Sequence, residues 1–303
     1  MFGIGMAEVG GRRTAVLAQG DEVLDLSQAL PREAGGSGLG GADTLELLRD
    51  WQAALPALER LAAAPGRGQY RVERDQMRWL PPVCYPDKVP CVGANYSDHI
   101  QEMGGTPHDP TKTDPFFFLK SPRNTLIGDR ENIVLPRASR KVDWEVELAV
   151  VVGRRAKHVP AAGAMDCIAG YTVFNDISAR DLQRRPDTRF VYDWIGGKCC
   201  DTSGPVGPVI VPARFVPDWR ALRLRCLVNG VVKQDAPASL MIHGIPEQIA
   251  FLSKILTLEP GDIIATGTPA GVGAGRQEFL KPGDVVVCEI EGIGRLTNRC
   301  VAE

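Results

Sequence analysis

The stretch DWEVELAVVVG at residues 143–153 places two glutamates, Glu145 and Glu147, at the start of a run of apolar residues. The run is typical of a buried β-strand, in which side chains two residues apart point to the same face. Both carboxylates are therefore expected on one face beside the core, where they repel each other and lose hydration. A divalent cation between them would relieve both effects. The alternative is a solvated face with basic partners, for which the candidates are Arg137, Arg140 and Lys141.

A third carboxylate, Asp176, follows the apolar run IAGYTVFN of the next predicted strand. Three carboxylates without a thiol or imidazole make an all-oxygen site, which suits Mg²⁺ or Mn²⁺ and does not suit zinc. Arg180 and Gln183 lie four and seven residues after Asp176, so a helical turn would align the three side chains. Arg180 could bind a substrate carboxylate through two hydrogen bonds, or form a structural ion pair with Asp181 or another acid.

The segment NYSDHIQEMG contains His99 and Glu102, which share one face if the segment forms a short helix. The carboxylate could then orient the imidazole and raise its basicity. Such pairs are also common as surface partners. The other three histidines are interpreted as loop or packing residues, and they are His108, His158 and His243.

Two glycine-rich segments supply further candidates. Lys198 lies in WIGGKCCDTSGPVGP, where neighbouring glycines let the backbone approach a ligand. If buried, this lysine needs an anion; the alternative is a loop lysine in solvent. The segment ATGTPAGVGAG at residues 265–275 offers backbone amides and the Thr268 hydroxyl to an anionic ligand, but it lacks the G-x-G-x-x-G spacing of a dinucleotide site.

Composition narrows the class of protein. The formal net charge is -2 and 44% of the 303 residues are hydrophobic, so neither nucleic acid nor an anionic membrane is an expected partner. No apolar stretch approaches the roughly 20 residues that span a bilayer, and the start does not resemble a signal peptide. The eight cysteines form no C-x-x-C pair and are predicted to be reduced. We therefore expect a cytoplasmic enzyme or binding protein.

The chain is expected to contain two units. Residues 1–80 predict a small α+β domain with two strands around a Gly-Asp turn and a helix over residues 45–61, capped by Asp43 or Thr44. Residues 81–303 are β-rich and predict a closed or rolled mixed sheet. Within them, Asn229-Gly230 indicates a type I′ hairpin and residues 245–256 indicate a helix.

Taken together, the segments over about residues 88–298 resemble the fumarylacetoacetate hydrolase superfamily. The resemblance rests on six motifs in this order: VGANYSDHIQEMG, DWEVELAVVVG, AGYTVFNDISARDLQ, GGKCCDTSGPVGP, VNGVVKQ and LEPGDIIATGTPAGVG. It implies a mixed β-sandwich roll, usually in a homodimer, with one Mg²⁺ or Mn²⁺ ion per subunit. Residues 1–80 resemble a small variable domain that some bacterial members carry.

The resemblance also implies roles for particular residues. By position, Glu145, Glu147 and Asp176 match the metal ligands. His99 and Glu102 match a water-activating pair on a lid over the substrate, and Lys198 matches a lysine beside the reacting oxygens. The residues that match substrate-binding positions are Arg180, Gln183 and Thr268.

For activity, the first hypothesis is a metal-dependent hydrolase that cleaves the C–C bond of acylpyruvate-type β-diketo acids, in catabolism of aromatic or related acids. The alternatives are a decarboxylase or isomerase of 2-oxo or 2-hydroxy-dienoic diacids, such as oxaloacetate-like acids or those of the homoprotocatechuate pathway, and a sugar-acid diketo hydrolase. A non-catalytic ligand-binding protein that has kept the fold is a hypothesis of another class.

Overall fold

The computed structural model describes residues 1–33 and 40–303. Its main element is an eleven-stranded sheet with the order β3-β2-β1-β15-β11-β10-β18-β5-β6, in which β4 also pairs with β1 and β7 with β15. The strands of this sheet are β1 (Gly3–Val9), β2 (Arg12–Gln19), β3 (Glu22–Asp25), β4 (Met77–Leu80), β5 (Val89–Gly93), β6 (Phe116–Lys120), β7 (Leu126–Ile127), β10 (Val146–Val152), β11 (Ile168–Asn175), β15 (Gly204–Pro212) and β18 (Ile263–Ala265).

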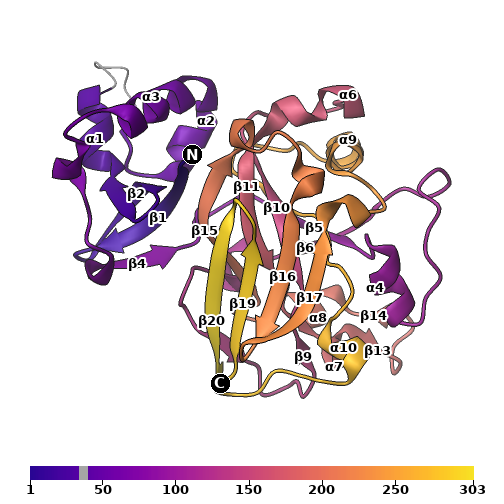
Figure 1. Ribbon diagram of the computed structural model, residues 1–303. Coiled ribbons are helices and arrows are strands. Elements are labelled where there is room, and N and C mark those ends of the chain that lie inside the picture. Colours follow the sequence, from indigo (N-terminus) through magenta and orange to yellow (C-terminus); the bar gives the residue numbers. More distant parts are fainter. Residues whose placement is uncertain (34–39) are drawn as a thin grey trace.

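A second, five-stranded sheet with the order β17-β16-β19-β20-β8 packs against the middle of the first. Figure 1 shows its orange and yellow strands lying across β10 and β11. The strands are β8 (Ile133–Leu135), β16 (Arg223–Val228), β17 (Val231–Pro237), β19 (Val285–Ile290) and β20 (Gly294–Ala302). This arrangement is the β-rich sandwich that the sequence predicted.

The alternation of side-chain direction along β10 decides which face of the sheet carries Glu145 and Glu147. Val146, Leu148 and Val150 point into the core between the two sheets, together with side chains of β16 and β19. Glu145 and Glu147 occupy the alternate positions along the chain and therefore point to the opposite face of the large sheet. The sandwich core thus fixes the direction of both carboxylates.

The opposite face of the sheet has its own core, which the N-terminal region covers. Helices α1 (Leu26–Glu33), α2 (Thr44–Arg49) and α3 (Trp51–Ala63) pack on the indigo strands in Figure 1. Their core is continuous with β10 through Ala149 and Val151. Strand β1 joins the large sheet through the pairing of Ile4 with Ile210. The domain boundary at residue 80 stays a prediction.

Local predictions mostly agree with the structure. The hairpin turns at Asn229 and Gly230, whose φ angles of 52° and 79° are positive as a type I′ turn requires. Helix α9 (Ile245–Ile255) matches the predicted helix. The single helix expected over residues 45–61 is wrong, because Asp50, with φ -126° and ψ 52°, separates α2 from α3. Aspartate competes with helical hydrogen bonds and favours such breaks.

The remaining short elements connect these layers or surround the site. They are α4 (Ser97–Glu102), α5 (Pro122–Thr125), α6 (Ala161–Ala164), α7 (Arg180–Gln183), α8 (Trp194–Lys198), α10 (Gly273–Arg276), β9 (Val142–Asp143), β12 (Ser178–Ala179), β13 (Arg184–Arg185) and β14 (Val191–Tyr192). All eight cysteines are free thiols, as predicted. In the part of the chain that the structure describes, no helix has the length and apolar character to cross a bilayer.

Candidate metal centre and active-site cavity

The ends of two neighbouring strands bring three carboxylates together. β10 and β11 pair in an antiparallel register that places Val146 opposite Asn175, so Glu145 and Asp176 adjoin at the strand ends. The backbone amide of Asp176 donates to the Glu145 carbonyl at 2.9 Å. Oxygens of Glu145, Glu147 and Asp176 lie within 4.8 Å of one another, and all three side chains are buried. The structure therefore groups the acids that the sequence proposed as metal ligands.

Cations surround two of these acids. The Lys198 ammonium lies 2.7 Å from Glu145 Oε2 and 2.6 Å from Asp176 Oδ2. Lys120 Nζ lies 2.6 Å from Asp176 Oδ1, and Arg180 donates to Glu145 Oε1. Glu147 Oε2 instead accepts a hydrogen bond from an uncharged donor, the Gly267 amide, at 2.7 Å. Positively charged side chains therefore compensate the negative charges of Glu145 and Asp176 more than that of Glu147.

The pKa values of Glu145 and Glu147 shift in opposite directions because their charged partners differ. Burial raises the pKa of Glu147 well above its usual value, and the adjacent Asp176 and Glu145 carboxylates raise it further. Burial also opposes ionisation of Glu145, but the Arg180 and Lys198 charges outweigh it and hold the pKa of that carboxyl well below its usual range. For Lys198, burial lowers the pKa, and the Asp176 and Glu145 charges reverse the effect and raise it.

These residues fit a divalent cation. The donor set is three carboxylates and contains only oxygen, as Mg²⁺ and Mn²⁺ prefer. Glu147 accepts its hydrogen bond from an uncharged amide, and burial together with the neighbouring Asp176 and Glu145 carboxylates raises its pKa. A divalent ion would supply positive charge beside this carboxylate.

A histidine faces the cluster from helix α4. His99 Nδ1 lies 2.9 Å from Glu102 Oε1, which confirms the predicted helical contact between the two side chains. The same Glu102 carboxylate accepts the Gly271 amide at 2.9 and 3.0 Å. Glu102 thus ties His99 to the loop after β18.

That loop, residues 267–274, binds the protein's own acids. Besides Gly267 on Glu147 and Gly271 on Glu102, the amides of Gly273 and Ala274 donate to Asp143 at 2.6 and 2.9 Å. The expectation that these amides are offered to an external anion is therefore wrong for the amides named here. The Thr268 hydroxyl is also engaged, since it donates to the Val146 carbonyl and accepts from Gln234.

A cavity of about 430 Å³ connects these groups. Its lining includes Glu145, Glu147, Lys198 and His99. The predicted substrate-binding residues Arg180, Gln183 and Thr268 also line the cavity. Three aromatic residues, Phe118, Tyr192 and Trp194, line it as well and are called its aromatic wall. The predicted substrate-binding residues and the predicted ligands Glu145 and Glu147 thus line one space, with Asp176 directly behind Lys198.

Residues 88–301 match the sequence profile of the family described as fumarylacetoacetate (FAA) hydrolase C-terminal. The chain belongs to the fumarylacetoacetate hydrolase family. This confirms the resemblance drawn from the motifs, and the β-rich α+β fold with a small N-terminal sheet region agrees with it.

Named family members differ in their reactions. The chain is 42% identical over 260 residues to the mitochondrial oxaloacetate tautomerase FAHD2A of Bos taurus, covering 85% of this chain and 79% of the relative. It resembles a crystal structure of a putative HpcE protein from Mycobacterium smegmatis, with a TM-score of 0.81, 33% identity and coverage of 98% and 99% of the two chains. It also resembles fumarylpyruvate hydrolase from Pseudomonas aeruginosa in complex with Mn²⁺ and pyruvate, with a TM-score of 0.64, 32% identity and coverage of 71% and 90%.

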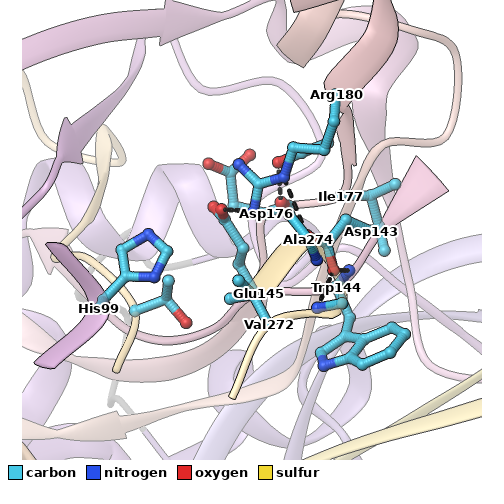
Figure 2. A network of polar contacts seen from close by, with 12 residues as sticks. His99, Asp143, Trp144, Glu145, Asp176, Ile177, Arg180, Val272 and Ala274 are labelled. Atoms are coloured by element: carbon cyan, nitrogen blue, oxygen red, sulfur yellow. Dashed lines mark hydrogen bonds and ion pairs between the residues drawn. The ribbon is translucent and has the colours of Figure 1, made fainter. Parts of the chain in front are cut away.

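Within this family member, Arg180 is placed differently from the prediction. Asp176 and Arg180 do not share a helix, because β12 lies between them and pairs with β9, so α7 begins only at Arg180. Arg180 Nε donates to Asp143 at 2.9 Å and its Nη2 donates to Glu145, as Figure 2 shows. Asp181 instead accepts from Ser139 and from the Arg140 amide. The alternative of a structural ion pair with Asp181 or another acid is therefore the one observed, and the acids are Asp143 and Glu145.

The proposed solvated partners of the glutamates are also corrected. Arg137 contacts Glu303 at the C-terminus, Arg140 donates to carbonyls of its own loop, and Lys141 lies over the Phe279 ring. Lys198 is 2% exposed and is not a loop lysine in solvent. None of the three proposed partners is among the described residues that line the cavity, and Lys120, Arg180 and Lys198 supply the cations beside the acids instead.

The sequence reasoning missed three residues that lie at the candidate site. Lys120 ends the apolar run FFFLK and is itself buried, and a buried lysine needs an anion. Asp143 lies two residues before Glu145, so the spacing that paired the glutamates could have included it. His108 does lie in a loop, but its side chain also lines the cavity.

Proposed function

We propose that this family member is a Mg²⁺- or Mn²⁺-dependent enzyme that interconverts the keto and enol forms of a small 2-oxo acid, with oxaloacetate as the first candidate. The observation that carries the proposal is the buried acid triad beside Lys198 and His99 in one cavity. Relatives named as oxaloacetate tautomerases, 42–44% identical, support this choice of reaction.

The residues divide the chemistry between them. Glu145, Glu147 and Asp176 would hold the ion, which would supply positive charge to polarise the substrate carbonyl. Removing a proton next to that carbonyl leaves negative charge on its oxygen. Lys198, a buried cation that lines the cavity, can stabilise that charge.

His99 is the proposed base that moves the proton. Its Nδ1 is held by Glu102, which leaves Nε2 to accept a proton from the substrate and return it to the other site of the enol. The contact with the Glu102 carboxylate fixes the orientation of the ring. Arg180, Gln183 and Thr268 remain proposed substrate-binding residues, on the evidence that they line the cavity.

A second candidate is hydrolysis of an acylpyruvate, the first hypothesis drawn from the sequence. The observation that favours it is the His99–Glu102 contact, because the same imidazole could take a proton from water that attacks the distal carbonyl. Cleavage of the C–C bond would again leave an enolate, which Lys198 can stabilise. Decarboxylation of oxaloacetate and isomerisation of dienoic diacids also pass through an enolate, and the test below includes decarboxylation as one of its outcomes.

The test is turnover by the Mn²⁺-loaded protein, with a chelator-treated sample and a Glu147→Gln variant as controls. Enol oxaloacetate is followed by its ultraviolet absorbance, and acetylpyruvate by release of acetate and pyruvate. Faster ketonisation than in both controls supports the tautomerase. Acetate formation without tautomerisation would shift the assignment to the hydrolase, and CO₂ from oxaloacetate would shift it to a decarboxylase. Equal rates in all three samples would overturn enolate chemistry at this site.

The homodimer implied by the resemblance also remains a proposal. Light scattering during size-exclusion chromatography tests it: a mass near twice the 32.8 kDa of one chain supports it, and a mass near 32.8 kDa contradicts it.

A further inference from the structure

Two buried lysines contact Asp176 from different segments. Lys120, at the end of β6, is 1% exposed, and its Nζ lies 2.6 Å from Asp176 Oδ1 and 3.1 Å from the Ile177 carbonyl. Lys198, at the end of α8, is 2% exposed and lies 2.6 Å from Asp176 Oδ2. Each oxygen of this carboxylate therefore has its own ammonium.

The surroundings of the two lysines differ. Lys198 lies among the described residues that line the cavity, and Lys120 does not. Lys120 contacts a side chain and a carbonyl of adjacent residues, Asp176 and Ile177, so it holds this one short segment. Lys198 bridges two different acids, through Asp176 Oδ2 and Glu145 Oε2.

The oxygens that Lys198 bridges belong to two of the three acids of the metal centre. A cation held by the triad must be close to the same carboxylates. Lys198 therefore competes for them with its own charge, whereas Lys120 engages the other oxygen of Asp176 and leaves Oδ2 to the site.

We propose that the two lysines affect metal binding in opposite directions: Lys120 is a positioning residue that orients Asp176 as a ligand, and Lys198 is an internal competitor that gives up its carboxylate contacts when the metal binds. The inference rests on the metal centre of the proposed function. It also explains how Lys198 becomes available to a substrate oxygen, because it is freed from two acids as the ion takes its place.

The physical argument predicts opposite signs. Without Lys120, Asp176 Oδ1 is left buried without its charged partner and the side chain loses its fixed orientation; losing such an outer partner typically weakens metal binding roughly 10–100-fold. Without Lys198, Glu145 and Asp176 lose a competing charge, so a divalent ion no longer has to displace it and binds several-fold more tightly.

The experiment is calorimetric titration of the full chain with Mn²⁺ alone. Lys120→Met is expected to raise the Kd roughly 10–100-fold and Lys198→Met to lower it. The matched control is Lys88→Met, since Lys88 forms a 3.0 Å ion pair with the buried Asp262 among residues outside the cavity lining. It should leave the Kd unchanged while costing stability, which thermal melting measures for every variant. If Lys120→Met does not fold, Lys120→Gln retains a donor and should raise the Kd by a smaller factor.

The outcomes separate the two proposals. If the wild-type chain binds no Mn²⁺ or Mg²⁺, the proposed function fails and this inference fails with it. If the wild type binds but Lys198→Met binds more weakly or equally, or the Lys120 variants bind as tightly as the wild type, only the inference about the lysines is overturned. A shift caused by Lys88→Met would show that lost stability alone explains the Lys120 result, which also overturns it.

Discussion

At the scale of single residues, Glu147 is the acid of the triad that a divalent ion would compensate most. It is 1% exposed, and it lies beside two other acids with an amide as its hydrogen-bond donor. Glu145 and Asp176 instead have lysine or arginine partners. A carboxylate so placed contributes repulsion and desolvation to the folded state, and a bound divalent ion would offset both.

We expect Glu147→Gln to abolish Mn²⁺ binding and turnover while the metal-free variant melts at the same temperature as the wild type or higher. The amide is similar in shape and removes one of three like charges. At about 100 times its Kd, Mn²⁺ should stabilise the wild type by about 2.7 kcal/mol and leave the variant unaffected. Melting curves with and without Mn²⁺ measure both effects; a variant stabilised like the wild type would refute the ligand assignment.

His99→Ala should lower kcat roughly 10²–10⁴-fold, the usual contribution of general acid–base catalysis, without changing the Kd for Mn²⁺. The reason is that the imidazole contacts Glu102 rather than the acid triad. Steady-state kinetics and metal titration are measured on the same sample. The exposed His158, with φ 54°, offers a control as His158→Asn, because asparagine tolerates that backbone conformation. Loss of metal binding in His99→Ala would make His99 a ligand or a structural residue.

At the scale of elements, the loop of residues 267–274 connects groups that the strands alone would leave separate. Its amides bind Glu147, Glu102 and Asp143, and Asp143 in turn holds Arg180 on the metal centre. The position of α4, which carries His99, is thereby linked to the position of the acid triad. The loop works because its backbone approaches these side chains closely.

Gly273→Ala tests this link. A Cβ atom at Gly273 would lie 2.1 Å from the Glu278 carbonyl oxygen and 2.7 Å from Asp143 Oδ1, so the loop must move. We expect a loss of about 1–3 kcal/mol in unfolding free energy and a larger proportional loss of activity. Gly163→Ala is the control, because its nearest contact would be 3.7 Å away and it should be neutral or slightly stabilising. Equal activity of the two variants would contradict the role of the loop.

The sequence predicted those parts of the site that depend on local periodicity. Glu145 and Glu147 share a face because strands have a period of two, and His99 meets Glu102 because helices bring residues three apart together. The pairing of Arg180 with Asp143, and of Lys120 with Asp176, joins segments 37 and 56 residues apart. Such pairs follow from sheet order and strand register, which local patterns do not specify.

At the scale of the whole molecule, the N-terminal region and the larger unit share one core. Ile4 and Leu17 on one side belong to the same apolar cluster as Phe174 and Val206 on the other. The sequence suggested separate units because proline-rich residues 80–90 interrupt the pattern. Composition reveals such an interruption, but not the surfaces that come into contact across it.

A chain of residues 81–303 alone should therefore be much less stable than the full chain. Each large apolar side chain that it uncovers costs about 1.5–3 kcal/mol, and the partners of several are missing. We expect the full chain to unfold in a single transition in urea and the shortened chain to lack a cooperative transition. Two separate transitions in the full chain, or a shortened chain with native stability and activity, would establish residues 1–80 as an independent domain.

The aromatic wall of the cavity gives the molecule an optical property. Trp194, one of five tryptophans, stacks on Phe118 with ring centroids 5.0 Å apart and lies 6.0 Å from Tyr192, and all three rings line the cavity. A ligand that fills the cavity displaces water from this indole, so its fluorescence should change on binding and Trp194→Phe should remove that signal. The protein thus carries an intrinsic reporter for ligands that are bound but not converted, which makes occupancy measurable independently of catalysis.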